Sequence, residues 1–313
     1  MEEIIFLEGT FKENVWGGNK LASVFNYKTH YSVTGEYWAI GAHPNGDSKV
    51  ISGEFKGKTL SFLWKNHKEL FKDYSNDSFP LLVKIIDAKD DLSVQVHPDD
   101  IYAKINENNS LGKSECWYVL DCAKDATIII GHTATNKQEL KDMIDEKKWK
   151  QLLREVPIKK GDFFQIDPGT IHAIKGGTMV LEIQQNSDIT YRLYDYNRKQ
   201  NGKLRNLHIN KSLDVIINPY ITPTTNFKTE TNSNYIEKIL IDCKYYKIRY
   251  INTKLEAKFF KTSSYELLSV ISGEGYINKT FIKKGDHFII SANLKEYVLS
   301  KNLEIIVSTA GEY

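Results

Sequence analysis

Short apolar runs separated by turn residues recur along the whole chain, and this pattern constrains the fold more than any other feature. Runs rich in Ile, Val, Tyr and Phe alternate with Gly, Asp and Asn, for example "EYWAIGAH", "CWYVLD", "ATIIIG" and "MVLEIQQ". β-Branched and aromatic segments bounded by turn residues are typical of strands, and many closely spaced short strands favour a β-sandwich or a jelly roll. The sequence therefore predicts a mainly β fold.

Two segments depart from this pattern and have helical periodicity. One is "LSFLWKNHKELFKD", residues 60–73, and the other is "TNKQELKDMIDEKKWKQLLREV", residues 135–156. Thr135 and Gln138 have the spacing of a capping box. One apolar stripe would follow, formed by Leu140, Met143, Ile144, Leu152 and Leu153. We expect a few helical insertions in the β fold.

A faint internal repeat divides the chain into two related units. "IKKGDFFQIDPGTIHAI" begins at Ile158, and "IKKGDHFIISANLKEYV" begins at Ile282. Upstream, "ECWYVLD" aligns with "ELLSVIS", which matches Glu115 with Glu266. Two related β units are the simplest interpretation.

The second unit lacks the imidazoles of the first. In the alignment, Glu296 takes the position of His172, and Ile248 takes the position of His97. If the first unit binds a metal ion, we expect that the second does not.

The segment "INPYITPTTNFKTETNSN", residues 217–234, is rich in Thr and Asn and has little periodicity. Such composition is typical of a linker. We predict a larger domain over residues 1–225, with the helical insertions, and a smaller C-terminal β domain over residues 226–313.

The bulk composition excludes several classes of protein. A net charge of +2 argues against a nucleic-acid binder, and no apolar run is long enough to span a bilayer. The acidic start "MEEIIFLEGTF" does not resemble a secretion signal. Cys116, Cys122 and Cys243 form no paired framework, which indicates reduced thiols. We expect a cytoplasmic protein, monomeric or weakly dimeric.

Polar side chains occupy one face of the predicted strand in "DDLSVQVHPDD". Ser93, Gln95 and His97 alternate there with apolar residues, so all three point the same way. Two further polar groups lie in strand-like settings: Glu115 precedes "CWYVL", and His172 follows a Pro-Gly turn. A solvated strand face and the wall of a site both fit this pattern.

Two imidazoles, a carboxylate and an amide can together hold a divalent metal ion. The four groups are far apart in sequence, which suits a barrel whose strands converge on a cavity. Zinc accepts N and O ligands, and Fe(II), Mn or Co would also fit. The alternative is a set of core histidines with ordinary hydrogen bonds, with Glu115 as a turn cap.

Charged residues are frequent in the stretch "LEIQQNSDITYRLYDYNRK". Glu182 lies on one strand, Asp188 and Arg192 share a face of the next, and Arg198 follows. Carboxylates and guanidinium groups on strand faces are costly to bury unless they are paired or hold a ligand. A surface salt-bridge ladder is the alternative.

Five of these motifs together resemble a known family. "FPLLVKIIDA", "LSVQVHPDD", "GKSECWYVL", "DPGTIHAI" and "SDITYRLYDYNR" are similar to type I mannose-6-phosphate isomerases in their short bacterial form, which are zinc-dependent cupins. The resemblance covers the whole chain. It implies a double cupin, with a catalytic metal-binding domain first and a cupin-like domain without a metal site second.

The resemblance also implies roles for individual residues. It matches one zinc ion per chain with the ligands Gln95, His97, Glu115 and His172. It matches a second set with catalytic groups of the pocket: Arg192, Lys113, Asp188 and Glu182. A third set matches phosphate-contacting groups: Ser93, Lys84 and Arg198.

The implied reaction interconverts mannose 6-phosphate and fructose 6-phosphate through an enediol. A base must take a carbon-bound proton, and the charge that develops on the sugar oxygens must be stabilised. We favour Lys113 as the base, with Asp188 orienting it or relaying the proton; Glu182 and a metal-bound water are the rivals. Gly112 stands where longer relatives have a histidine before the lysine.

Two functions from other classes remain open. A different metal cupin, such as an Fe(II) oxygenase, would use two histidines and one carboxylate. A non-catalytic cupin that binds sugar phosphates would use the same pocket without turnover. In every case we expect a small-molecule partner, and neither a nucleic acid nor a membrane.

Overall fold

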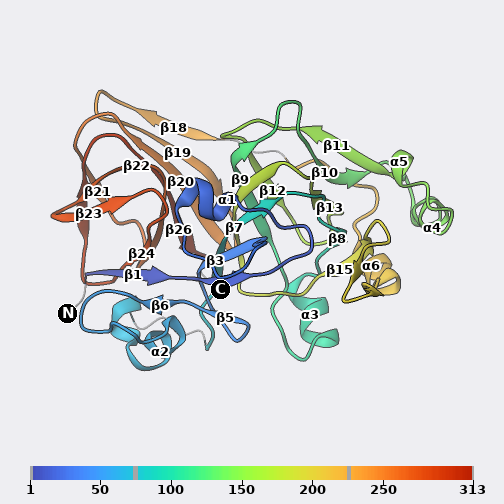
Figure 1. The fold of residues 1–313 in the computed structure, drawn as a ribbon, viewed down its shortest axis with the longest axis horizontal. Coiled ribbons are helices and arrows are strands. Elements are labelled where there is room, and N and C mark those ends of the chain that lie inside the picture. The colour runs from blue at the N-terminus through green and yellow to red at the C-terminus, as the bar shows by residue number, and fades with distance from the viewer. Residues whose placement is uncertain (1–2, 73–76, 224–226, 312–313) are drawn as a thin grey trace.

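The computed structural model describes residues 3–72, 77–223 and 227–311. The strands form antiparallel sheets that make up two adjoining barrels (Figure 1). The green and yellow strands of the first barrel lie on the right in this view, and the orange and red strands of the second lie on the left. The prediction of a mainly β double jelly roll with helical insertions is confirmed.

The first barrel consists of two sheets that enclose an apolar cluster containing Trp117, Ile128 and Val180. One sheet has six strands in the spatial order β12 Phe163–Ile166, β9 Glu115–Cys122, β14 Thr178–Gln185, β7 Leu81–Ala88, β3 Glu36–Ile40 and β2 Thr10–Lys12. The other has five strands in the order β11 Leu153–Pro157, β10 Thr127–His132, β13 His172–Ile174, β8 Val94–Val96 and β15 Tyr191–Tyr194. Two-stranded ribbons join β4 Ala42–His43 to β5 Gly46–Asp47, and β16 Lys199–Gln200 to β17 Lys203–Leu204.

The second barrel is an eleven-stranded sheet to which the N-terminal strand contributes. Its main path runs β18 Lys228–Thr231, β19 Tyr235–Asp242, β20 Tyr246–Thr253, β26 Leu303–Ala310, β22 Glu266–Ile277, β24 His287–Ile290, β1 Ile4–Glu8 and β6 Lys49–Val50. The strands off this path are β21 Ala257–Phe260, β23 Thr280–Lys283 and β25 Glu296–Leu299. Because β1 pairs with β24, the first described residues extend the sheet of the C-terminal part of the chain.

The internal repeat is present in the strand register. Glu115 on β9 lies opposite Ile166 on β12, and Glu266 on β22 lies opposite Ile290 on β24. Ile166 and Ile290 occupy the same position in the two "IKKGD" repeats. The two units are therefore related in structure, as the alignment of Glu115 with Glu266 predicts.

The predicted equivalence of His97 with Ile248 is wrong. In the first unit β13 pairs with β8, and in the second β25 pairs with β21, where Glu296 lies opposite Phe260. Strand β21 therefore takes the place of β8, and Thr262 takes the place of His97. The alignment failed because the connection that follows the strand is longer in the first unit, where the helix α3 Asp100–Asn106 lies between β8 and β9.

The helices are insertions and caps around the barrels. They are α1 Lys20–Phe25, α2 Leu60–Asn66, the 3₁₀ helix η1 Lys68–Phe71, α3 Asp100–Asn106, α4 Lys137–Asp145, α5 Trp149–Leu152 and α6 Ile209–Val215. The helix predicted over residues 60–73 is confirmed as α2 followed by η1, and residue 73 lies outside the described residues. None of the helices in the described part of the chain is both long and apolar enough to cross a bilayer.

The helix predicted over residues 135–156 is correct only in its first part. It divides into α4 and α5, and the chain then continues as strand β11, in which Val156 pairs with Ile128. Pairing with β10 therefore outweighs the helical pattern there. The N-cap of α4 is Asn136, whose side chain accepts a 3.0 Å hydrogen bond from the backbone of Glu139, so the predicted Thr135–Gln138 box does not form.

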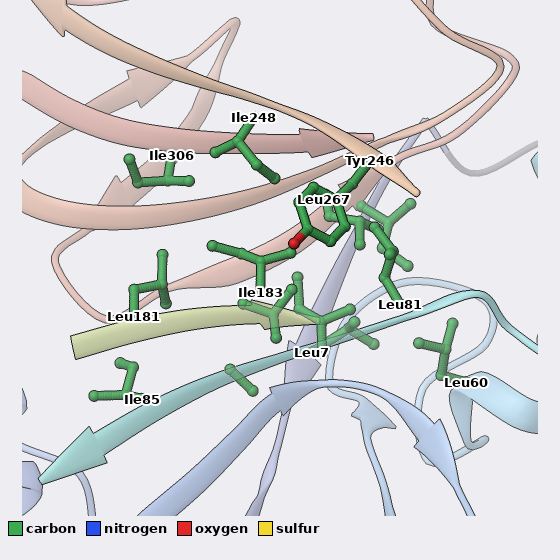
Figure 2. Packing of buried hydrophobic residues seen from close by; sticks show 14 of the residues in the cluster. Leu7, Leu60, Leu81, Ile85, Leu181, Ile183, Tyr246, Ile248, Leu267 and Ile306 are labelled. Carbon is green, nitrogen blue, oxygen red and sulfur yellow. The ribbon is translucent and has the colours of Figure 1, made fainter. Parts of the chain in front are cut away.

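A single apolar cluster joins the two barrels. Ile183 and Leu81 from the first barrel pack with Tyr246 and Leu267 from the second, and all four are buried (Figure 2). The predicted domain boundary at residues 225 and 226 lies outside the described residues. Within the predicted linker, β18 is a strand that pairs with β19.

Candidate metal centre and adjoining cavity

Three candidate ligands converge inside the first barrel although they lie on different strands. Glu115 begins β9, His172 begins β13, and His97 follows β8. All three side chains are fully buried, and their ligand atoms lie within 4.8 Å of one another. The fourth candidate, Gln95, lies opposite His172 in the pairing of β8 with β13.

The distances within the cluster are those of groups that face a common point. His97 Nε2 is 3.3 Å from Glu115 Oε2, and His172 Nε2 is 3.4 Å from Glu115 Oε1. The Gln95 amide nitrogen is 3.3 Å from His172 Nε2, so this amide must turn over to offer its oxygen to a metal ion.

Backbone carbonyls hold both imidazoles in the tautomer that suits a metal ligand. Nδ1 of His97 donates to the carbonyl of Ile189 at 2.8 Å, and Nδ1 of His172 donates to that of Thr170 at 2.9 Å. Each Nε2 therefore keeps its lone pair for the cluster. Burial lowers the pKa of His97 to about 3 and also lowers the pKa of His172, so both rings are neutral near pH 7.

Glu115 supplies a negative charge without a hydrogen bond of good geometry. Burial alone would raise its pKa, but the charge of Lys113 is the main cause that lowers the pKa well below its usual range. Lys113 Nζ lies 2.7 Å from Glu115 Oε2 and 3.1 Å from His97 Nε2. Both carboxylate oxygens are otherwise unpartnered among the described residues. Two imidazole lone pairs and an ionised carboxylate fit a divalent metal ion.

A cavity of about 280 Å³ opens next to this cluster. Seven of the residues singled out in the sequence line it: Lys84, Ser93, Gln95, Lys113, Glu182, Asp188 and Arg192. The three buried ligands lie behind its wall. Ser93 and Gln95 reach the cavity, and His97 reaches the cluster, so the polar face of "SVQVH" is an inner wall.

Sequence reasoning missed several polar and aromatic residues of the same cavity. They are Asn14, Glu36, Trp38, Trp117 and Arg205. Glu36 accepts a 2.6 Å hydrogen bond from the indole of Trp38. The available signal was the polar Glu36 at the start of an apolar strand, which is weak when taken alone.

Glu182 and Lys84 form a buried pair because they lie opposite each other on β14 and β7. Lys84 Nζ is 3.2 Å from Glu182 Oε1 and also lies 4.8 Å from the ring centre of Trp38. Trp117 donates to Glu182 Oε2 at 3.1 Å. Burial, and then the charge of Glu115, raise the pKa of Glu182 against the opposing effect of the two lysines.

Lys113 carries a charge that its neighbours stabilise. Burial alone would lower its pKa, but Glu115 and Glu182 raise the pKa above its ordinary value. Asp188 lies at the mouth of the cavity, where it accepts a 2.6 Å hydrogen bond from Asn45. In the part of the chain that the structure describes, no hydrogen bond or ion pair links Asp188 to Lys113, so the predicted relay has no direct path.

Arginines surround the buried Asp195 at the side of the cavity. Arg198 binds Asp195 and the carbonyl of Asp91, and it is not among the described residues that line the cavity. Arg205 lines the cavity and lies 3.2 Å from Asp195. Arg192 also lines it, and donates to the carbonyl of Asn206 at 3.0 Å.

Comparison with known proteins gives consistent matches along the chain. Residues 4–118 match the family model "Phosphomannose isomerase type I, catalytic domain", and residues 235–310 match "Mannose-6-phosphate isomerase, cupin domain". The chain is 49% identical to mannose-6-phosphate isomerase ManA of Bacillus subtilis, over 98% of each chain. It is 42% identical to mannose-6-phosphate isomerase of Streptococcus mutans over the full length of both.

A solved structure agrees with these matches. The crystal structure of mannose 6-phosphate isomerase from Bacillus subtilis superposes with a TM-score of 0.96 at 43% identity, covering 98% of this chain and all of that one. Identity at this level over the whole length establishes common descent with a common fold. The chain therefore belongs to the type I phosphomannose isomerase family.

Proposed function

We propose that this chain interconverts mannose 6-phosphate and fructose 6-phosphate, with one zinc ion held by His97, Glu115, His172 and Gln95. The observation that carries the proposal is the buried cluster of two neutral imidazoles and an ionised carboxylate. It lies beside a cavity lined by basic side chains. The relatives that match over the full length bear the same activity in their names.

Zinc suits this donor set because it accepts nitrogen and oxygen ligands at low coordination number. A metal ion held by these residues would supply a Lewis acid that stabilises negative charge developing on the substrate. The remaining tasks belong to residues of the chain: binding the phosphate, holding the sugar, and moving one proton between adjacent carbons.

The proton transfer is best assigned to Glu182. The base takes the proton from C2 of the open-chain aldose and returns it to C1, while a hydroxyl proton moves from O2 to O1, so the atoms balance. Glu182 lines the cavity, and its raised pKa brings the carboxyl closer to the working pH of a base. This assignment differs from the preference for Lys113 based on the sequence.

Lys113 has a different role in this proposal. Its raised pKa keeps it protonated, and a protonated ammonium cannot accept the carbon-bound proton. It lies 2.7 Å from Glu115, where its charge keeps the carboxylate ionised. A metal ion bound to Glu115 would work against the raised pKa of Lys113. A Lys113 variant therefore belongs in the kinetic test of the base.

The basic groups of the cavity are suited to the phosphate dianion and the developing enediolate. A fixed guanidinium stabilises charge that appears in the transition state, and this role is assigned to Arg192. Lys84 and Ser93 remain proposed phosphate contacts, as does Arg198. We add Arg205, because it lines the cavity while Arg198 is held by Asp195.

A coupled assay on mannose 6-phosphate, with and without a chelator, tests the function. Turnover that is lost on chelation and restored by zinc is the expected result. Binding of the sugar phosphate without turnover would instead support a non-catalytic cupin, and oxygen consumption with Fe(II) would support an oxygenase.

Three further features remain proposals. The free thiols of Cys116, Cys122 and Cys243 are compatible with a cytoplasmic location. A monomer or weak homodimer is the proposed assembly, which light scattering after size exclusion tests. Division into domains over residues 1–225 and 226–313 is tested by limited proteolysis.

A further inference from the structure

Tyr246 of the second barrel reaches into the first barrel with its hydroxyl group. It begins β20 and is fully buried at the junction of the two barrels, beside Leu267 and Leu81 (Figure 2). Its Oη lies 3.0 Å from Oε1 of Gln165 and 3.2 Å from Oγ of Ser114. A phenylalanine would fill the same space, so packing alone does not account for the hydroxyl group of Tyr246.

The three side chains form a closed ring of hydrogen bonds with one consistent direction. The Tyr246 hydroxyl donates to Oε1 of Gln165, and Nε2 of Gln165 donates to Oγ of Ser114 at 3.0 Å. The Ser114 hydroxyl therefore donates back to Tyr246. Each group is both donor and acceptor, so the bonds of the ring polarise one another.

The ring is buried, and it therefore resists being opened. Tyr246 and Ser114 are fully enclosed, and Gln165 is nearly so. Loss of the Tyr246 hydroxyl leaves Oε1 of Gln165 without its donor and the Ser114 hydroxyl without its acceptor in a buried place, which costs more than the bond itself contributes. The ring therefore holds the side chain of Ser114 in one place.

Ser114 is the residue between Lys113 and Glu115, and its backbone is fixed as well. Its N–H donates to Oε1 of Gln185 at 2.9 Å, and its carbonyl accepts from the backbone of Gln185 at 3.0 Å. On the other side, Tyr246 of the second barrel holds the Ser114 side chain through the hydrogen-bonded ring. A displacement of Ser114 moves Lys113 and Glu115 with it, because peptide bonds join both residues to Ser114.

We propose that Tyr246 is a positioning residue for the metal centre, which acts by holding Ser114 and through it Lys113 and Glu115. In the second barrel a phenylalanine, a threonine and two glutamates take the places of the four candidate ligands. Tyr246 touches neither the cavity nor the candidate ligands. The kinetic test of this role rests on the proposed isomerase function, whereas the measurement of Zn²⁺ affinity does not.

The test is Tyr246→Phe, which removes only the hydroxyl. We expect kcat to fall about tenfold with KM changed less than about twofold, and the dissociation constant for Zn²⁺ to rise about tenfold. Changes of this size are usual when a residue behind a metal ligand is altered. Competition with a chromogenic chelator measures Zn²⁺ affinity without the substrate.

Tyr297→Phe is the matched control. Tyr297 is a buried tyrosine of the same barrel, and its hydroxyl donates to Glu266 at 3.1 Å without contact to Ser114. We expect it to lower stability while kcat and Zn²⁺ affinity stay unchanged. Equal losses in the two variants, or wild-type kcat and Zn²⁺ affinity in Tyr246→Phe, would overturn the proposal.

Ser114→Ala provides a second route if Tyr246→Phe does not fold. It removes the Ser114 hydroxyl, which the other two members contact, and changes no residue of the second barrel. We expect the same loss in kcat and Zn²⁺ affinity as in Tyr246→Phe. In the double variant the losses should not add, because both changes open the same ring. If no variant and no wild-type protein turns over the sugar phosphate, the Zn²⁺ affinities alone decide the proposal.

Discussion

Glu115 and Glu266 occupy the same register position in two related barrels, but different groups surround their carboxylates. Glu115 keeps both oxygens facing two neutral imidazoles and one ammonium. Glu266 is bound by Arg249 at 2.7 Å and accepts hydrogen bonds from Tyr297 and Thr262. Both carboxylates face one cationic side chain, but among the described residues only Glu266 also has its oxygens satisfied by hydrogen bonds. Glu115 is therefore left able to hold a metal ion.

The first prediction concerns the metal ion and uses this pair. Glu115→Gln removes the only anionic ligand of the cluster, and we expect loss of bound zinc together with loss of turnover. Glu266→Gln is the control and should keep stoichiometric zinc in the folded protein. Elemental analysis of dialysed protein measures both. Full turnover in zinc-free wild-type protein would contradict the metal requirement.

Arg192 should contribute to the rate more than to binding. Its guanidinium lines the cavity as a fixed positive charge, so Arg192→Ala is expected to lower kcat by about a hundredfold, the usual effect of losing one charge-stabilising donor. Arg154→Ala, outside the cavity, serves as the control. A change in KM alone would make Arg192 a binding residue.

The base is tested by comparing Glu182→Gln with Lys113→Met. Loss of a general base lowers the rate by about 10²- to 10⁴-fold, and we expect this in Glu182→Gln. Exchange of the C2 proton with deuterated solvent, followed by NMR, reports on the same step. If Lys113→Met abolishes exchange and Glu182→Gln retains it, then Lys113 is the base.

Phosphate recognition is tested at two arginines that share Asp195. Arg205 faces the cavity, so Arg205→Ala should raise KM for mannose 6-phosphate by tenfold or more, as expected for losing a charge-assisted hydrogen bond. Arg198→Ala should lower the unfolding midpoint, because it takes a partner from the buried Asp195. The reverse pattern would assign the phosphate to Arg198.

The sequence could predict the parts of the site that depend on local periodicity. Alternation along one strand is enough to place Ser93, Gln95 and His97 on the same face. The order of the motifs along the chain then identified Glu115 and His172 as further candidates. These two lie beside His97 only because the barrel closes.

The parts that the sequence could not predict depend on pairing between distant strands or on competition between structures. Glu36 reaches the cavity because β3 pairs with β7, and nothing near Glu36 in the sequence indicates that partner. Arg198 and Arg205 look alike in sequence and both pair with Asp195, but of the two only Arg205 lines the cavity. Strand β11 has a helical pattern, and its pairing with β10 decides its form.

A buried histidine of the second barrel should make stability depend on pH. His287 is enclosed between the hydroxyls of Tyr27 at 2.9 Å and Ser269 at 2.8 Å. Burial lowers its pKa to about 3. No candidate ligand or cavity residue contacts it among the described residues, so its effect can be measured apart from the site.

The sign follows from the two protonation states. Below about pH 6.5 the unfolded chain binds a proton at His287, and the folded chain binds it only near pH 3, so the free energy of unfolding falls as the pH falls through this window. The contribution is about 1.4 kcal/mol per pH unit, or about 2 kcal/mol between pH 7 and pH 5.

Glutamine keeps hydrogen-bonding groups but does not titrate. In urea denaturation, His287→Gln should therefore lose about 2 kcal/mol less than the wild type between these two pH values. Parallel losses in the two proteins would mean that His287 takes up its proton in the folded state as readily as in the unfolded chain.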